Sequence, residues 1–168
     1  TENAIAGEYA LRANNMTPWV LLVGADERLE RYRHPLPSQH VMQRRVMLAI
    51  GAERDGLLTA CSRIVSFEPL TDELAERHRA VATVETALWS KTLPGVTFGE
   101  MFAEAQAAYA AAGCADQWRL HHQGGPLGYQ PRDAKASPGD PTVALAGQAF
   151  AWNPSITGTK SEDSILCT

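Results

Sequence analysis

The chain is organised around residues 118–129, which read WRLHHQGGPLGY. An alternation of apolar and polar residues ends at the adjacent His121 and His122, and a glycine-rich turn follows. Neighbouring side chains of a strand point to opposite faces, so both histidines can face one pocket only if the strand ends there. Gly124 and Gly125 allow a close approach by another backbone or a ligand. A plain hairpin whose histidines pair with nearby carbonyl groups is the structural alternative.

A second stretch, residues 153–163 (NPSITGTKSED), favours a functional site over the plain hairpin. It is polar and rich in turn-forming residues, and it lies near the end of the chain. The stretch closes with the acidic pair Glu162 and Asp163, which opens a short apolar strand. Two polar, turn-forming stretches of this kind predict a shared pocket.

Length and composition indicate one globular domain. The chain has 168 residues, of which 45% are hydrophobic, and no apolar run approaches the ~20 residues of a membrane span. The net charge is −4 and the basic residues are scattered, which gives no support for nucleic-acid or membrane binding. Cys61, Cys114 and Cys167 are too far apart for a CxxC metal pair and indicate a reducing, cytoplasmic setting.

The periodicity predicts helices and strands in alternation. The long helix at 71–91 begins at Thr71 or Asp72, and His78 on its apolar stripe is interpreted as a packing residue. The helix that begins at Thr97 ends at Gly113. We also expect a helix at 1–16, strands at 19–23, 46–50, 57–67, 118–122, 143–146, 148–152 and 164–167, and loops at 31–38 and 134–142.

These stretches together resemble the pita-bread superfamily of creatinase, prolidase, aminopeptidase P and methionine aminopeptidase. In that family a helix that begins with Thr-Glu leads to a loop with a pocket histidine. A DxG hairpin, an SDxTR strand, a GHGxG turn, an EP turn and a final ED strand follow. The corresponding segments here are Leu48–Ala52, Thr59–Arg63, Gln123–Gly128, Trp152–Pro154 and Ser161–Leu166.

The resemblance covers nearly the whole chain and implies an α+β pita-bread fold. We expect a curved antiparallel sheet with helices on its outer face, two pseudo-twofold halves, and a site on the concave side. Residues 1–168 form one such domain. The resemblance further implies that the family's first helix and an N-terminal domain are missing from this chain, and that the protein is a homodimer whose partner completes the pocket.

The family's dinuclear metal site has two aspartates, one histidine and two glutamates as ligands. In this alignment the aspartates correspond to Ala49 and Ala60, the histidine to Gly125, and one glutamate to Asn153. Only Glu162 is retained, and alanine or glycine offers a metal no donor atom. The expected site therefore holds no metal and needs no cofactor.

Polar residues nevertheless remain at the family's site positions. His34 stands where creatinase, the metal-free hydrolase of the family, has its acid/base, and Glu162 stands at the terminal carboxylate. His121 matches a substrate-side histidine of aminopeptidase P-like members. We expect His34, Glu162 and His121 to be catalytic, and we expect the substrate to contact Arg63, Tyr129, Lys160, Gln123 and Asn153.

Each of these residues has a structural alternative. His34 can cap a turn in its RHPLP loop, and His122 is expected to point away from the pocket if His121 points in. Arg63 can pair with Glu162 instead of a substrate carboxylate. Arg132 and Asp133 can pair with each other at the surface. The aromatic side chains of Tyr129 and Trp152 can either shape the pocket wall or fill the core.

Three functions are compatible with these residues. The first is a metal-independent hydrolase that acts on a C–N bond of a small amino-acid, peptide or guanidino compound. The second is a non-catalytic module that binds peptides or proteins. The third is a metallopeptidase with relocated ligands, taken from His121, His122, Asp133 and Glu162. Convergence of His34, His121 and Glu162 on one cavity would favour the first over the second.

Overall fold

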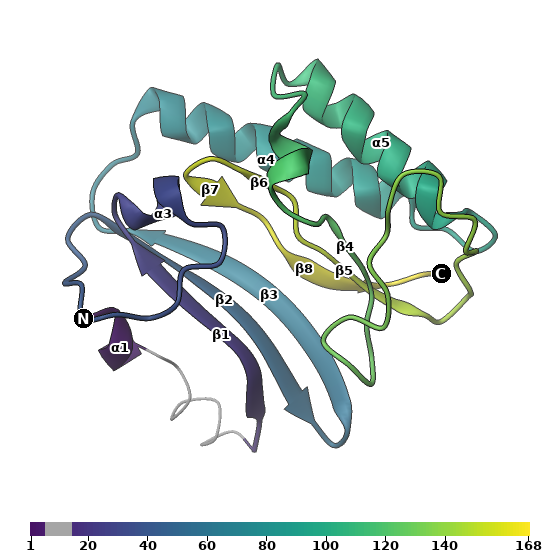
Figure 1. Ribbon diagram of the computed structural model, residues 1–168, viewed down its shortest axis with the longest axis horizontal. Coiled ribbons are helices and arrows are strands. Elements are labelled where there is room, and N and C mark those ends of the chain that lie inside the picture. The colour runs from purple at the N-terminus through teal and green to yellow at the C-terminus, as the bar shows by residue number, and fades with distance from the viewer. Residues whose placement is uncertain (6–14) are drawn as a thin grey trace.

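The computed structural model describes residues 1–5 and 15–168. Small antiparallel sheets lie beneath two long helices (Figure 1). The elements are α1 (Glu2–Ile5), β1 (Thr17–Ala25), α3 (Arg28–Arg31), β2 (Arg45–Arg54), β3 (Leu57–Ser66), α4 (Asp72–Lys91), α5 (Phe98–Ala111), the 3₁₀ helix η1 (Gln117–Leu120), β4 (Gly124–Pro126), β5 (Ala149–Trp152), β6 (Ser155–Ile156), β7 (Thr159–Lys160) and β8 (Asp163–Leu166).

The first sheet has the order β1–β2–β3, and both of its strand pairs are antiparallel. The turn between β2 and β3 consists of Asp55 and Gly56, which have φ angles of 56° and 81°. Positive φ at both central residues is typical of the type I′ turn, whose twist matches that of the strands. The strands expected at 46–50 and 57–67 therefore form a hairpin, with β2 extending to Arg54 and a turn of only two residues.

The second sheet has the order β4–β5–β8, and it joins the first sheet through β3. The Ser62 amide of β3 donates to the Glu162 carbonyl at 2.9 Å, and the Ala60 amide donates to Ser164 Oγ at 2.9 Å. The strands form a continuous curved surface with β8 beside β3 (Figure 1). This junction brings Glu162 to the centre of the surface.

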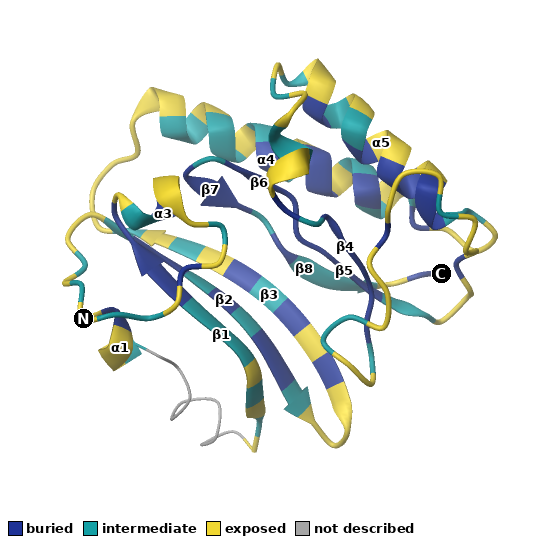
Figure 2. Ribbon diagram, viewed as in Figure 1, coloured by how far each residue is buried: buried dark blue, intermediate teal, exposed yellow. Residues whose placement is uncertain are grey.

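The two long helices cover the outer face of this surface. Helix α4 begins at Thr71, whose side chain accepts from the Leu74 amide, and α5 begins at Thr97 with a capping box. Their inward faces are buried and their outward faces are exposed (Figure 2). The core between helices and sheet contains Val81, Val84, Leu88, Phe98, Met101, Phe102, Ala105, Tyr109, Ala136, Ala144, Phe150, Trp152, Ile156 and Cys167. The predicted α+β architecture, with helices outside a curved sheet, is confirmed.

The prediction of a strand at residues 118–122, which include the paired histidines, is wrong. Residues 117–120 form η1, and β4 begins only at Gly124. The Gln123 side-chain amide donates to the backbone carbonyls of Trp118 and His121, at 3.1 and 2.6 Å. In a sheet, these carbonyls would accept hydrogen bonds from a neighbouring strand instead. The two histidines therefore lie in a connecting segment, where strand alternation does not apply.

Two further differences concern the C-terminal third. The predicted strand at 143–146 is wrong, since the segment forms only the isolated bridge between Val143 and Thr97. It crosses the start of α5, where the Ala144 amide donates to the Val96 carbonyl at 2.9 Å. The sequence reading also missed the β6–β7 hairpin, whose turn contains Gly158 with a φ of 87°.

At the N-terminus the structure begins with the short helix α1. The predicted helix at 1–16 agrees with it at residues 2–5, whereas residues 6–14 lie outside the described part of the chain. Within residues 1–5 and 15–168, no helix has the length and apolar character that crossing a membrane requires.

Candidate functional site

A cavity of about 380 Å³ lies on the concave face of the joined sheets. Strands β1 to β3 supply a mostly apolar wall, and the loops and the β5–β8 segment supply the polar groups. The lining consists of Val20, Leu22, His34, Ala49, Ile50, Gly51, Thr59, Ala60, His122, Pro131, Arg132, Lys135, Asn153, Lys160 and Glu162. An apolar wall with a few convergent polar side chains is typical of a small-molecule site.

The loop that carries His34 is held by buried contacts. Glu2 is fully buried, and its carboxylate accepts from the Ala25 amide at 2.8 Å and from the Ser38 amide at 3.0 Å. Pro35 packs so closely on β1 that a Cβ on Gly24 would lie 2.4 Å from its ring. His34 therefore extends from a rigid loop, and the acidic residue of the Thr-Glu pair anchors that loop.

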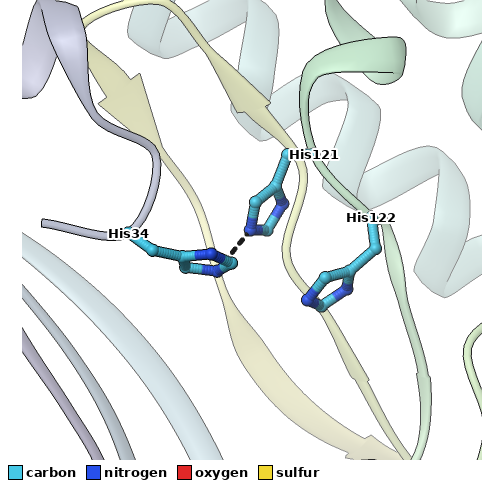
Figure 3. A group of neighbouring side chains, drawn as sticks. All are labelled: His34, His121 and His122. Atoms are coloured by element: carbon cyan, nitrogen blue, oxygen red, sulfur yellow. Dashed lines mark hydrogen bonds between the residues drawn. The ribbon is translucent and has the colours of Figure 1, made fainter.

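The side chains of His34, His121 and His122 lie together (Figure 3), and His34 and His122 line the cavity. The Nε2 atoms of His34 and His121 are 2.7 Å apart, which places one N–H between them. The His121 and His122 rings stack with centroids 4.5 Å apart, and the His34 and His122 centroids are 5.9 Å apart. His122 is expected to point away only if His121 points into the pocket. The structure has the reverse arrangement, in which His122 lines the cavity and His121 bonds His34 without lining it.

All three imidazoles are held in the neutral form. Burial, and then the charge of Lys160, lowers the pKa of His34 below its ordinary value. The same two causes lower the pKa of His121 to about 2. Burial followed by the charge of Arg132 lowers the pKa of His122 to about 3. Near neutral pH the cluster therefore presents nitrogen lone pairs, which suit a base or a ligand.

Glu162 is the anionic residue of the cavity lining. Its carboxylate accepts from Ser62 Oγ at 2.6 Å and Arg132 Nη2 at 2.7 Å, and it lies 3.2 Å from Lys160 Nζ. Burial alone would raise the pKa of Glu162, but Lys160, Ser62 and Arg132 outweigh burial and lower it. Glu162 is therefore ionised, and it orients the two cations beside the cavity.

Two other cavity groups hold polar atoms without partners. Asn153 Oδ1 and Arg132 Nε are buried, and neither has a hydrogen-bond partner among the residues that the structure describes. Arg132 and Lys135 were not among the residues expected to contact a substrate. The alternative in which Arg132 pairs with Asp133 at the surface does not hold, because Arg132 folds inward to Glu162 and only 12% of its side chain is exposed.

Three expected substrate contacts lie elsewhere. Arg63 is on the outer side of β3, where it pairs with Asp163 at 2.7 Å, so neither the substrate contact nor the pair with the Glu162 carboxylate holds. Tyr129 is 81% exposed and is absent from the cavity lining. Gln123 is fully buried and accepts from Tyr109 at 2.9 Å, a structural contact. Lys160 and Asn153 do line the cavity.

The residues present do not fit a dinuclear metal centre. Ala49 and Ala60 line the cavity without donor atoms, and Glu162, the carboxylate of the lining, already binds two cations and a hydroxyl. Gly125 has a φ of 152°, and a Cβ there would lie 2.4 Å from the Ala134 carbonyl oxygen. The position that resembles the family's metal histidine is therefore closed by backbone.

The relocated ligand set of His121, His122, Asp133 and Glu162 is not brought together. Among the described residues, the groups whose ligand atoms lie within 4.8 Å of one another are His34, His121 and His122, and separately Asp26, Glu27 and His40. Asp133 is exposed and belongs to neither group.

Solved structures share this fold over the whole chain. The dipeptidase PepE from Mycobacterium ulcerans is 23% identical with a TM-score of 0.89, and the match covers 100% of this chain and 48% of that one. The prolidase from Pyrococcus horikoshii OT3 is 21% identical with a TM-score of 0.90, covering 99% of this chain and 51% of that one. The chain thus spans about half the length of these proteins.

The same fold also occurs in a protein that is not named as a peptidase. The N-terminal domain of the FACT complex subunit SPT16 from Cicer arietinum (chickpea) is 11% identical with a TM-score of 0.76, covering 99% of this chain and 45% of that one. No curated protein sequence matches the chain. The family model for metallopeptidase family M24 matches residues 3–168, nearly the full length. With this match and the pita-bread fold of prolidases over its whole length, the chain belongs to metallopeptidase family M24.

Proposed function

We propose that this peptidase-family domain is a metal-independent hydrolase that acts on a C–N bond of a small amino-acid, peptide or guanidino compound. The hydrogen bond of 2.7 Å between His34 and His121, at the cavity where His34 faces the space for a substrate, carries this proposal. A neutral imidazole there can accept a proton from an attacking water and return it to the leaving nitrogen. The pair supplies this proton transfer from side chains alone.

In this proposal the remaining polar groups bind and orient the substrate. Arg132 and Lys135 replace Arg63 as contacts for a substrate carboxylate, because they line the cavity and Arg63 does not. Asn153 Oδ1 is available to accept an N–H of the substrate. Glu162 acts as an orienting carboxylate through Lys160 and Arg132, and His121 acts through His34 as a positioning residue.

The test is turnover by protein that has been stripped with a chelator. A panel of dipeptides, amino-acid amides and creatine-like guanidino compounds would be screened for amine release by mass spectrometry. His34→Ala should lower kcat on the best substrate by about 10²- to 10⁴-fold. His78→Ala is the matched control, since His78 lies outside this cavity and bonds Thr159. Unchanged turnover in His34→Ala, with folding verified by circular dichroism, would reject the acid/base role.

A non-catalytic binding module is the second candidate. The absence of donor atoms at Ala49 and Ala60, and the likeness in fold to the SPT16 domain, favour it. Against it, His34 and Glu162 line one cavity and His121 bonds His34, which is the convergence expected of an enzyme. Calorimetric binding of a panel member without turnover in any condition would favour the module.

The assembly and location of the protein are also proposals. We infer an N-terminal domain before this one and a homodimer, on the resemblance to prolidases, about half of whose length the match covers. The three free cysteines support a reducing, cytoplasmic compartment. Sedimentation of the natural full-length protein would test the dimer.

A further inference from the structure

We propose that His34, His121 and His122 form a binding site for one transition-metal ion, distinct from the family's dinuclear centre and open to the cavity. The site is new in the sense that its ligands are none of the five positions that resemble family ligands. His34 comes from the loop between α3 and β2, whereas His121 and His122 come from the segment between η1 and β4 (Figure 3).

The geometry suits one ion with three nitrogen ligands. One ring nitrogen from each histidine lies within 4.8 Å of the other two, and His34 Nε2 and His121 Nε2 are 2.7 Å apart. A tetrahedral zinc ion with bonds of about 2.0–2.1 Å separates its ligand nitrogens by on the order of 3.3 Å. Small rotations of the side chains would widen the shorter separation and close the longer one to that value.

The hydrogen bonding of the cluster favours a ligand. The Nδ1 atoms of His121 and His122 are buried and have no hydrogen-bond partner in the described part of the chain. Three imidazoles packed together without carboxylates between them leave lone pairs unsatisfied, and an ion would satisfy one on each ring.

The surrounding charges decide which ion would bind. Lys160, Arg132 and Lys135 lower the affinity for any dication and favour an anion as its fourth ligand, such as hydroxide or a carboxylate from the cavity. Mg²⁺ and Ca²⁺ require oxygen ligands, and the Glu162 oxygens are already engaged. The site therefore suits ions that prefer imidazole, such as Zn²⁺, Co²⁺, Ni²⁺ and Cu²⁺.

The second cluster of possible ligands, Asp26, Glu27 and His40, is explained without a metal. Asp26 accepts from the amides of Gln43 at 3.0 Å and Arg44 at 2.8 Å, and it pairs with His40 Nε2 at 3.0 Å. Burial alone would raise the pKa of Asp26, but these hydrogen bonds lower it to about 2. The carboxylate is committed to fixing the loop before β2, so this cluster provides a control.

Metal binding has a consequence for activity that rests on the proposed function. The ion would occupy the lone pairs of His34, the proposed acid/base, and of His121, which positions it. Metal-bound and acid/base-active forms of the site therefore exclude each other. A stoichiometric ion should inhibit turnover, and a chelator should restore it.

The experiment is equilibrium dialysis of the chelator-stripped chain against Zn²⁺, with elemental analysis and a parallel Co²⁺ titration followed by visible absorption. One ion per chain is expected, with the intense bands of low-coordinate Co²⁺. His34→Gln, His121→Gln and His122→Gln should each weaken binding by at least about tenfold, since even outer partners of a ligand are worth that much. His40→Ala and His78→Ala should bind as the unmodified chain does.

Two binding results would reject the proposed metal site. Failure of the unmodified chain to retain an ion, or undiminished binding in His122→Gln, would reject it. Loss of binding in His40→Ala alone would assign the ion to the other cluster. His34→Gln is the variant least expected to disturb folding, because His34 is exposed on its loop. Turnover without any ion binding rejects only the metal site, whereas ion binding without turnover in either state rejects only the proposed hydrolase.

Discussion

Gly125 shows how a single residue can close a functional position. It resembles the family's metal histidine in sequence, but its φ of 152° is one that residues with a side chain rarely adopt. A Cβ would also meet the Ala134 carbonyl oxygen at 2.4 Å, because the chain folds back over the glycine turn. The local backbone therefore leaves no room for a histidine side chain at residue 125.

We predict that Gly125→Ala lowers the free energy of unfolding by roughly 2 kcal/mol or more. A side chain is strained at this φ angle, and its Cβ would clash with the Ala134 carbonyl oxygen. Gly128→Ala is the control in the same turn, since its nearest non-neighbouring atom is an Asp133 oxygen at 3.8 Å. It should change stability by no more than about 0.5 kcal/mol. Urea unfolding of both variants makes the comparison, and equal losses would refute the steric explanation.

At the scale of elements, local signals predicted the helices well. Thr97 and Glu100 form a reciprocal capping box, in which the Glu100 amide donates to Thr97 Oγ1 at 3.2 Å and the Thr97 amide donates to Glu100 at 2.9 Å. Such contacts lie within four residues, so the sequence displays them directly. The strand at the histidines was mispredicted because the Gln123 side chain bonds the carbonyls of Trp118 and His121, a short-range contact that the alternation of apolar and polar residues does not reveal.

We predict that Thr97→Ala destabilises the fold by ~1 kcal/mol through loss of the cap of α5. Thr83→Ala serves as the control, since Thr83 is exposed inside α4 and its hydroxyl only returns to the Arg79 carbonyl at 3.0 Å. Thermal unfolding should separate the two variants. Similar melting temperatures would show that the core against α5, and not its cap, determines the stability of this helix.

At the scale of the whole molecule, Glu85 connects the helical layer to the site. It lies on α4, is 3% exposed, and accepts a hydrogen bond from Ser161, which immediately precedes Glu162. Burial raises the pKa of Glu85 from 4.5 to about 7. The folded state therefore keeps the Glu85 proton over a pH range in which the unfolded chain has released it.

The sign of the resulting pH dependence follows from proton linkage. The stabilisation is fully present below pH 4.5 and is lost as the pH rises through about 7. The free energy of unfolding should fall across this range by up to about 1.4 kcal/mol per pH unit. Glu85→Gln should remove that slope, whereas Glu76→Gln, at an exposed position of the same helix, should keep it. Urea unfolding at several pH values tests this, and parallel curves for Glu85→Gln and the unmodified chain would contradict it.

The sequence by itself determined where α4 and α5 begin and which strands form the β2–β3 hairpin, because caps, turns and periodicity are short-range properties. Resemblance of motifs identified the family and its α+β fold, and it named His34, His121 and Glu162 as candidates. Only the tertiary structure decided that His122 joins His34 and His121, that Arg132 turns inward, and that Arg63 faces outward. These outcomes depend on contacts between residues 30 to 100 positions apart, such as Arg132 with Glu162 and Arg63 with Asp163, which no local pattern encodes.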